Sequence, residues 1–343
     1  MDAIVLAGGY ATRLWPITRR RPKMLLPVGE TTVIDGVLQS LEADDRIETT
    51  YLSTNEAFAD EFEAHIDEMG YEKVQLSVES TADEDEKFGV VGALAQLIDR
   101  EGIDDDLFVI GGDNLIGFDP SEFLDFFEER DGPALAAYDV GSREKAKSYG
   151  LVELDGERVV DFQEKPDNPK STLVSIACYA FPADSLRFEE YLSGDNNPDE
   201  PGWYIDWLQQ QEPVSAFTFD DVWFDIGTPD SYFETVEWKL DGGSLIHPDA
   251  TVENSEIGDT VHVMAGAEVT DSSLDRAIIF PDAEVHDCDI DETILARTST
   301  SRGTTCPGRS SSTVDGSRRW GHRSSAGRDT IRRQPPHRWR RTK

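Results

Sequence analysis

Along the first 240 residues, short apolar runs alternate with longer stretches in which apolar residues recur every three or four positions. The short runs predict strands and the longer stretches predict amphipathic helices. Strands alternating with helices indicate an α/β domain with a mostly parallel sheet, helices on both faces, and ligand sites at the carboxyl ends of the strands. The expected strands are 3–7, 49–53, 74–78, 107–111, 134–138 and 214–219, and the expected helices are 33–41, 57–69, 91–100 and 120–129.

From residue 244 the pattern changes, because apolar residues now recur every five or six positions. Neither a strand period of two nor a helical period of three to four gives this spacing. It is typical of a hexapeptide β-helix, in which each apolar residue stacks on the one in the coil below. We therefore expect about three coils over residues 244–296. The recurring residues are Ile246, Val252, Ile257, Val263, Val269, Leu274, Ile279, Val285, Ile290 and Leu295.

The charge of the chain is divided unevenly. The 343 residues carry a formal net charge of −37, but residues 297–343 hold thirteen Lys and Arg against two Asp and Glu. The remaining 296 residues hold nineteen basic and 67 acidic residues. So large an acidic excess repels itself unless salt screens it, which favours a halophilic, haloarchaeal protein. An acidic protein that binds cations or a basic partner is the alternative.

Residues 297–343 contain almost no aliphatic side chains and no period. We expect either a disordered basic tail or the product of a shifted reading frame, because the segment interrupts the repeat abruptly. The N-terminal pattern leads us to expect no signal peptide, and no run in the sequence approaches the roughly 18 apolar residues of a membrane span. These features predict a cytoplasmic protein with no membrane partner.

The densest chemical signal is the run LAGGYATRLWPITRRRPKMLLPV, which starts at Leu6. An apolar strand ends at Gly8 and Gly9, and glycines at such a turn let a phosphate approach the backbone N–H groups. Arg13 adds a bidentate guanidinium fork and Lys23 a point charge in the same loop. The run therefore predicts a loop that binds phosphate at the end of the first strand.

This run resembles the signature of the sugar-1-phosphate nucleotidyltransferases, GGxGTRLxPxTxxxPKxxLPV, of the glucose-1-phosphate thymidylyltransferase or NDP-sugar pyrophosphorylase type. Twelve positions match in register. The resemblance implies a Rossmann-like nucleotidyltransferase domain over residues 1–240, followed by a left-handed β-helix. One departure is Ala11, which stands where the family has glycine and would cost about 1 kcal/mol if its φ is positive. The implied nucleotide-binding residues here are Leu6, Ala7, Gly8, Gly9 and Thr12.

Two carboxylates are candidate metal ligands. Asp113 follows an apolar strand, and a carboxylate at a strand end suits Mg²⁺, which takes one or two carboxylates together with phosphate oxygens. The resemblance assigns the second ligand to Asp225, in the segment WFDIGT. We therefore expect Mg²⁺ between these two residues.

The resemblance also places the sugar phosphate. The segments YGLV and EKP correspond to the family's sugar-phosphate site, so Gly150 and Glu164 would contact the sugar and Lys165 its phosphate. Gly89, before the helix expected at 91–100, would let the nucleobase approach the backbone.

The resemblance implies an enzyme that transfers a nucleotidyl group from an NTP to a sugar 1-phosphate and releases pyrophosphate. Arg13 would stabilise the pyrophosphate, Lys23 the α-phosphate and Lys165 the incoming phosphate, and no nucleic acid is involved. A glucose-1-phosphate thymidylyl- or uridylyltransferase is favoured; a mannose-1-phosphate guanylyltransferase and a non-catalytic regulatory homologue remain alternatives. A glycosyltransferase is less favoured, because the acidic triplet at 104–106 precedes its strand. An acyltransferase is the least favoured alternative, because about three coils offer no cleft and no histidine stands in a catalytic context. Copies of the chain could assemble into a homo-oligomer through the repeat.

Overall fold

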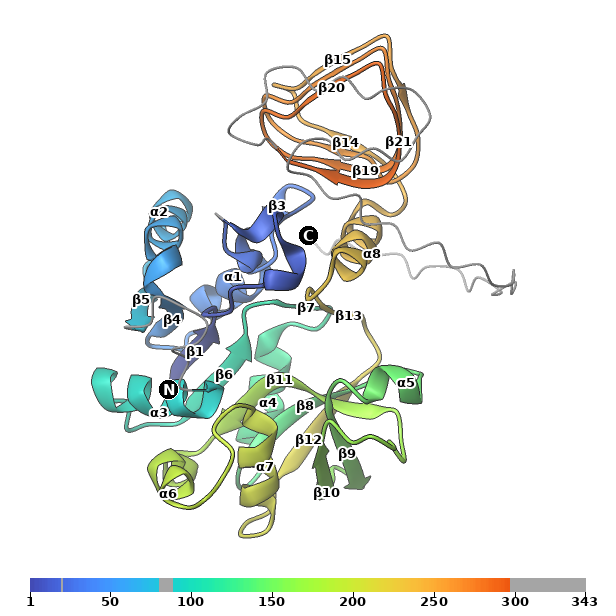
Figure 1. Ribbon diagram of the computed structural model, residues 1–343. Helices are drawn as coiled ribbons and strands as arrows, with labels where there is room; N and C mark the ends of the chain where they lie inside the picture. Colours follow the sequence, from blue (N-terminus) through green and yellow to red (C-terminus); the bar gives the residue numbers. More distant parts are fainter. Residues whose placement is uncertain (20, 80–88, 297–343) are drawn as a thin grey trace, which may run out of the picture.

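The computed structural model describes residues 1–19, 21–79 and 89–296. A mixed sheet flanked by helices forms the larger part, and a stack of short strands follows the helix α8 (Pro229–Leu240) (Figure 1). No helix in the described residues is long and apolar enough to cross a membrane. The basic tail expected at 297–343 lies outside the described residues.

The central sheet has nine strands in the order β5-β4-β1-β6-β11-β8-β12-β10-β9. The six strands expected from the apolar runs are confirmed, each within two residues of its bounds. The nine strands are β1 (Asp2–Leu6), β4 (Thr50–Asn55), β5 (Val74–Glu79), β6 (Leu107–Gly111), β8 (Ala134–Asp139), β9 (Gly150–Asp155), β10 (Arg158–Glu164), β11 (Leu173–Phe181) and β12 (Ser215–Phe219).

The expectation of a mostly parallel sheet is wrong for half of this sheet. Strands β5, β4, β1 and β6 pair in parallel, as expected. Strand β11 is antiparallel to both of its neighbours β6 and β8, and β10 is antiparallel to β12 and β9. For β9 and β10 the physical reason is the connection between them, which is only two residues long, at 156–157. A connection that short joins antiparallel strands, since parallel neighbours need a long crossover.

The two faces of the sheet are covered by different helices, so the domain has three layers. Side chains alternate along β1, where Ala3 and Val5 face one core and Ile4 faces the other. The first core is closed by α1 (Asp35–Ala43), α2 (Ala59–Met69) and α4 (Pro120–Glu128). The second core is closed by α3 (Val90–Glu101), α6 (Phe188–Ser193) and α7 (Pro201–Gln209). The four helices expected from the sequence are confirmed within two residues, and α5 (Arg143–Ala146), α6 and α7 were not expected.

Short elements carry the loop after β1 and the ribbon beside the pocket. The loop contains the 3-10 turns η1 (Thr12–Leu14), η2 (Ile17–Arg19) and η3 (Lys23–Leu25), then the small pair β2 (Pro27–Val28) and β3 (Thr31–Thr32). The ribbon pairs β7 (Asn114–Ile116) with β13 (Trp223–Asp225) in antiparallel register. Two further 3-10 turns are η4 (Glu56–Phe58) and η6 (Ala183–Ser185).

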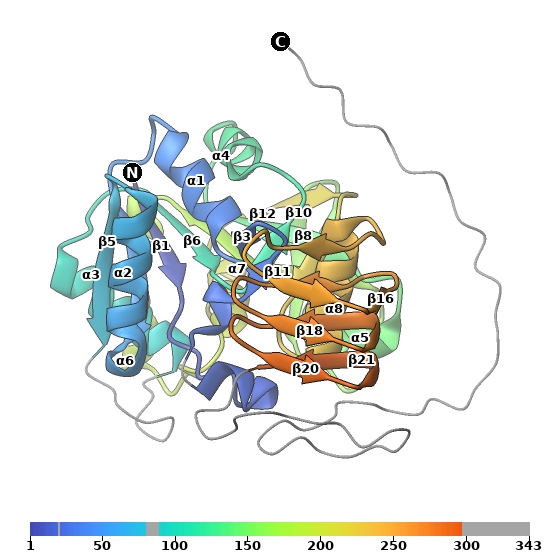
Figure 2. The same cartoon turned by 90° about the horizontal axis from the view of Figure 1, so that it is seen from above.

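Residues 244–296, named here the C-terminal coils, form short strands that pair in parallel with strands one coil away. The recurring apolar residues stack in three columns. The first pairs in these columns are Ile246 with Val263, Val252 with Val269, and Ile257 with Leu274. Figure 1 shows the coils end-on as a triangle, and Figure 2 shows their strands in layers. The strands are β14 (Leu245–Ile246), β15 (Thr251–Glu253), β16 (Glu256–Ile257), β17 (His262–Val263), β18 (Glu268–Thr270), β19 (Ser273–Ile279), β20 (Glu284–His286) and β21 (Asp289–Leu295).

Candidate active site

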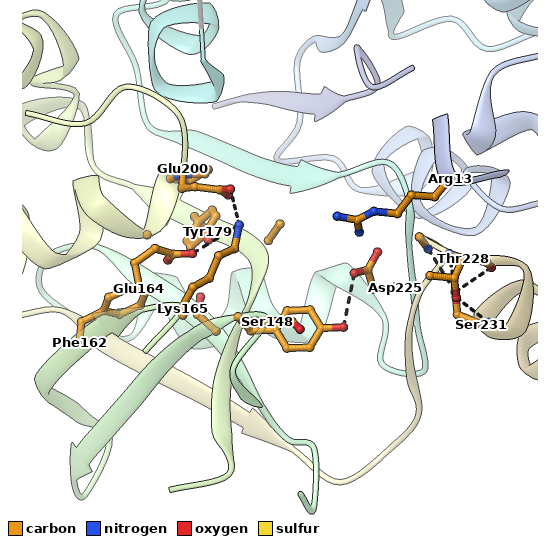
Figure 3. A pocket seen from close by; sticks show the side chains of 17 residues that line it. Arg13, Ser148, Phe162, Glu164, Lys165, Tyr179, Glu200, Asp225, Thr228 and Ser231 are labelled. Carbon is orange, nitrogen blue, oxygen red and sulfur yellow. Dashed lines mark hydrogen bonds and ion pairs between the residues drawn. The ribbon is translucent and has the colours of Figure 1, made fainter. Parts of the chain in front are cut away.

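A pocket of about 580 Å³ opens between the strand ends of the sheet and the start of α8. It brings together five of the residues expected at the site, namely Arg13, Gly150, Glu164, Lys165 and Asp225. Figure 3 shows Arg13 and Asp225 on one side of this pocket and Glu164, Lys165 and Glu200 on the other. Cations therefore stand at both ends of the pocket, with a carboxylate beside each.

The loop after β1 is held by its own backbone. Ala11 has a left-handed conformation with φ 48°, which confirms the strain expected if that position needs a positive φ. The carbonyl oxygen of Ala11 accepts hydrogen bonds from the Leu14 N–H at 2.9 Å and from the buried Thr18 hydroxyl at 2.8 Å. Arg13 lies inside the turn that these bonds close, so the guanidinium is carried on a fixed backbone.

The other expected nucleotide-binding residues lie around the end of β1, outside the lining of the pocket. Ala7 is buried and its N–H donates to the Ser53 carbonyl at 2.7 Å. The Gly8 carbonyl accepts a hydrogen bond from the Asn55 side chain at 2.9 Å. Leu6, Gly9 and Thr12 complete this strand end, and their contact with a nucleotide stays a prediction.

The two expected metal ligands are brought together by the β7–β13 ribbon. Asp225 pairs with Asn114, the residue after Asp113, and the Ile226 N–H donates to the Asp113 carbonyl at 3.3 Å. Burial and the neighbouring Asp113 carboxylate raise the pKa of Asp225 above its usual range. Lys23 forms an ion pair with Asp113. The ribbon thus places two carboxylates beside the pocket, and Lys23 reaches Asp113 from the loop after β1.

This pair of carboxylates fits a hard divalent cation. The two carboxylates are close enough for their repulsion to raise a pKa, and a bound cation would remove that repulsion. In the described residues no group of three or more His, Cys, Asp and Glu could hold a metal. Mg²⁺ suits such a sparse donor set, because it keeps several waters and takes its remaining ligands from substrate phosphates.

Tyr149 is a site residue that sequence reasoning did not assign. Its hydroxyl donates to Asp225 Oδ2 at 3.4 Å, and its ring packs edge-on against Trp223 at 5.0 Å between centroids. Burial, followed by the charge of Asp225, raises the pKa of Tyr149 to about 12. The tyrosine therefore stays protonated as a donor that orients the Asp225 carboxylate.

Glu164 and Lys165 lie at the opposite end of the pocket. Lys165 has a left-handed backbone with φ 44° and pairs with Glu200, while its Nζ lies 3.9 Å from Glu164 Oε1. The side chain of Glu164 is 7% exposed. Burial, followed by the charge of Glu200, raises the pKa of Glu164 to about 7. This buried carboxyl is suited to bind a neutral hydroxyl group.

Two glycines make room for Glu164. A Cβ on Gly202 would lie 1.8 Å from Glu164 Oε2, and one on Gly150 would lie 2.4 Å from the Phe162 ring. Gly150 is buried and lines the pocket. Its observed role is therefore to admit the Phe162 and Glu164 side chains, and contact with the sugar phosphate stays a prediction.

Gly89 has a packing role in the structure. Its φ is +74°, and a Cβ there would lie 2.4 Å from the Pro198 carbonyl oxygen. The first N–H groups of α3 donate to the carbonyls of Pro198 and Asp199, at 2.9 and 3.2 Å. These bonds occupy donors at the helix start that the sequence interpretation left open for a nucleotide. A role for Gly89 in binding the base stays a prediction.

Other pocket residues lie at the starts of α7 and α8, for which the sequence offered only short local patterns. Glu200 immediately precedes the Pro201 that begins α7, and a Pro at the first helical position was the signal available for this boundary. Thr228 caps α8 by accepting from the Ser231 N–H at 3.1 Å, as the segment GTPDS indicates. Thr228 and Ser231 line the pocket beside Asp225.

Comparison with known proteins places the chain among enzymes. The profile of the nucleotidyl transferase family matches residues 2–241. A Sulfolobus acidocaldarius protein named as a mannose-1-phosphate guanyltransferase is 31% identical over 285 residues, which cover 80% of this chain and 76% of that protein. The bifunctional protein GlmU of Methanocaldococcus jannaschii is 28% identical over 246 residues, or 70% of this chain and 55% of that protein. A glucose-1-phosphate adenylyltransferase of Rhodopirellula baltica is 28% identical over 264 residues, or 67% and 58%.

The chain thus spans little more than half the length of the last two relatives. A crystal structure from Bacillus anthracis, described as a glucose-1-phosphate thymidylyltransferase, matches with a TM-score of 0.61 at 22% identity, over 70% of this chain and 96% of that one. This likeness shows the fold. Because the family profile covers the whole sheet domain and these relatives are named for transfer to sugar phosphates, the chain belongs to the nucleotidyl transferase family, among relatives that are sugar-phosphate nucleotidyltransferases.

Proposed function

We propose that this chain transfers a nucleotidyl group from an NTP to a sugar 1-phosphate, giving an NDP-sugar and pyrophosphate. The observation that carries the proposal is the pocket itself. Arg13 stands at one end, Lys165 at the other, and the half-buried Asp225 lies beside Arg13. Two phosphorylated substrates that meet end to end need cations at both ends and charge neutralisation between them.

Asp113 and Asp225 are the residues that would hold Mg²⁺. The bound ion would neutralise negative charge on the phosphates. Tyr149 keeps Asp225 oriented by its hydrogen bond at 3.4 Å. Lys23 forms an ion pair with the Asp113 carboxylate in this structure. A phosphate that binds Lys23 instead would free that carboxylate for the ion.

The chain's own residues bind and align the reactants. An oxygen of the sugar 1-phosphate attacks the α-phosphorus, a new O–P bond forms, and the bond to pyrophosphate breaks. A phosphate oxygen is already a nucleophile, so no Ser, Cys or His has to be activated. We assign the pyrophosphate to Arg13, the α-phosphate to Lys23 and the incoming phosphate to Lys165. Positioning and charge then account for the rate.

The sugar would lie against Glu164. Its carboxyl is buried beside Gly150 and Gly202, at the end of the pocket that also holds Lys165. A carboxylate there accepts hydrogen bonds from sugar hydroxyls. The nucleotide would lie along the turn after β1, against Leu6, Ala7, Gly8, Gly9 and Thr12, with Gly89 near the base.

Two substrate pairs deserve the first trial. Mannose 1-phosphate with GTP is favoured by the name of the Sulfolobus acidocaldarius relative, which matches 80% of this chain. Glucose 1-phosphate with dTTP or UTP is the pair that the signature loop suggests. We also propose that residues 1–240 are the catalytic domain and that the C-terminal coils are a left-handed β-helix through which copies of the chain assemble.

Pyrophosphate release tests the proposal. The five common NTPs would be crossed with the 1-phosphates of mannose, glucose, galactose and N-acetylglucosamine, with Mg²⁺ and molar KCl to screen the acidic surface. We expect release with one pair, and loss of that release in Arg13→Ala. Folded protein that releases no pyrophosphate from any pair would contradict the proposal.

A further inference from the structure

One buried apolar cluster joins the C-terminal coils to the loop that carries Arg13 and Lys23. Three parts of the chain contribute to it: the segment from the loop after β1 to Val33, the segment from Ile226 through α8, and the outer face of the coils. Figure 1 shows α8 between the sheet domain and the coils. The buried members are Leu14, Leu26, Val28, Val33, Ile226, Tyr232, Phe233, Val236, Met264, Ile278, Phe280 and Ile294.

Phe280 contacts both the loop and α8 at this junction. Its side chain is 3% exposed, and its ring lies 6.5 Å from the Tyr232 ring between centroids. The Arg21 guanidinium lies over the Phe280 ring, 5.0 Å from its centroid. The Tyr232 hydroxyl in turn donates to the Pro27 carbonyl at 2.7 Å. A residue of the coils thus contacts the loop directly and, through Tyr232, at its far end.

Arg13 and Lys23 lie close in sequence to residues that contact this junction. Leu14, which is fully buried in the cluster, follows Arg13. Arg21 is two residues before Lys23. Arg21 is half-buried where it meets the coils, and this burial lowers the pKa of its guanidinium. A cation over an aromatic ring contributes on the order of 1 kcal/mol, enough to bias the position of a loop.

We infer that Phe280 is a positioning residue for catalysis: the C-terminal coils hold Arg21 and, with it, the loop that presents Arg13 and Lys23 to the pocket. Phe280 touches no substrate, and the inference rests on the proposed function. Glu164 and Lys165 come from β10 and the residue after it, which lie outside the cluster, so their end of the pocket is independent of this contact.

The competing explanation is that the junction only stabilises the fold. Two substitutions separate the two roles. Phe280→Leu keeps an apolar side chain and removes the ring beneath Arg21, whereas Phe280→Tyr keeps the ring. Val285→Ala is the matched control, because Val285 is 1% exposed inside the coils and belongs to a different cluster, away from the loop.

Steady-state kinetics give the first readout. We expect Phe280→Leu to lower kcat by about tenfold or more, because small misplacements of charged groups are costly. The KM for the sugar 1-phosphate should stay near the wild-type value. Phe280→Tyr should restore kcat. Val285→Ala should lose a similar amount of thermal stability with normal kcat.

Coupling and hydrogen exchange complete the test. Arg21→Met should reproduce the loss, and Arg21→Met with Phe280→Leu should lose no more than either change alone. Amide exchange of residues 10–26 should be faster in Phe280→Leu than in Val285→Ala, and this readout does not depend on activity. Equal exchange in the two variants, or losses of kcat that add in the double variant, would overturn the inference. Wild-type protein that is inactive but shows the exchange difference would contradict the proposed function and leave the positioning contact standing.

Discussion

The Thr18 hydroxyl donates a 2.8 Å hydrogen bond to the carbonyl of Ala11, the residue that holds a left-handed backbone in the phosphate loop. Thr18 is fully buried, so the bond fixes the strained turn from within. An L-residue with a Cβ is disfavoured in this conformation by about 1 kcal/mol relative to glycine.

The first prediction follows from that strain. Ala11→Gly should raise the free energy of unfolding by up to about 1 kcal/mol, because glycine adopts a positive φ without the steric cost. Thr18→Val should lower it by about 1 kcal/mol, since the Ala11 carbonyl loses a buried donor. Urea unfolding in molar KCl measures both. A stability loss in Ala11→Gly would show that chain entropy outweighs the strain.

The second prediction concerns the carboxylate pair. Asp225→Asn should lower turnover at least a hundredfold, as expected when a group that neutralises transition-state charge is removed. The same change should raise the thermal midpoint, because it removes one of two like charges that burial and Asp113 disfavour. Turnover and a melting curve on the same preparation test it. Normal turnover in the folded variant would remove Asp225 from the mechanism.

A third prediction uses the raised pKa of Glu164, which is about 7 against an ordinary value of 4.5. The unfolded chain gives up this proton more readily than the folded chain. The stabilising contribution is therefore full below pH 4.5 and is lost as pH rises through 7, with a total on the order of 3 kcal/mol.

Glu164→Gln should remove that pH dependence, which appears as the difference between wild-type and variant unfolding free energies from pH 4.5 to 8. Because the ionised carboxyl is the better hydrogen-bond acceptor, the KM for the sugar 1-phosphate should fall in wild type as pH rises through about 7. The KM of Glu164→Gln should be flat over the same range. Parallel pH profiles for the two proteins would argue against this assignment.

The fourth prediction concerns His262 on the outer face of the coils. Its side chain is 4% exposed, and its Nδ1 has no hydrogen-bond partner in the described residues. Burial lowers the pKa of His262 to about 4. The unfolded chain therefore binds a proton first as pH falls from 6.5, and stability is lost between 6.5 and 4.

His262→Leu should remove this acid sensitivity, because the position stacks between Leu245 and Ile278. It should also gain about 1 kcal/mol at neutral pH, since an unsatisfied buried nitrogen disappears. Turnover should not change. Melting curves from pH 4 to 8 compare the two proteins, and identical acid sensitivity would show that other groups control it.

The sequence predicted best what depends on local periodicity. The apolar residues of the coils recur at fixed spacing, and in the structure each third one stacks on its predecessor, as Val252, Val269 and Val285 do. The signature loop likewise placed Arg13 at the pocket. Both patterns lie within a short stretch of sequence, where spacing alone constrains the structure.

Pairings between distant segments could not be predicted. The apolar run 173–181 is compatible with a parallel or an antiparallel strand, and the pairing of β11 with β6 and β8 decides between them. Nothing near Tyr149 indicates that its hydroxyl meets Asp225, and nothing near Lys165 indicates Glu200. These contacts exist because the tertiary fold brings the partners together, so their signal is spread over the whole chain.

The columns of the C-terminal coils also show where this part of the chain absorbs changes in length. Seventeen residues separate Val252 from Val269 and sixteen separate Val269 from Val285, yet both pairs stack in register. The extra residue falls in the corner between Ile257 and Val263, whose counterpart between Leu274 and Ile279 is one residue shorter. Insertions at that corner leave every inward-facing side chain inward, whereas one residue added within a strand would turn the following apolar residues out into water.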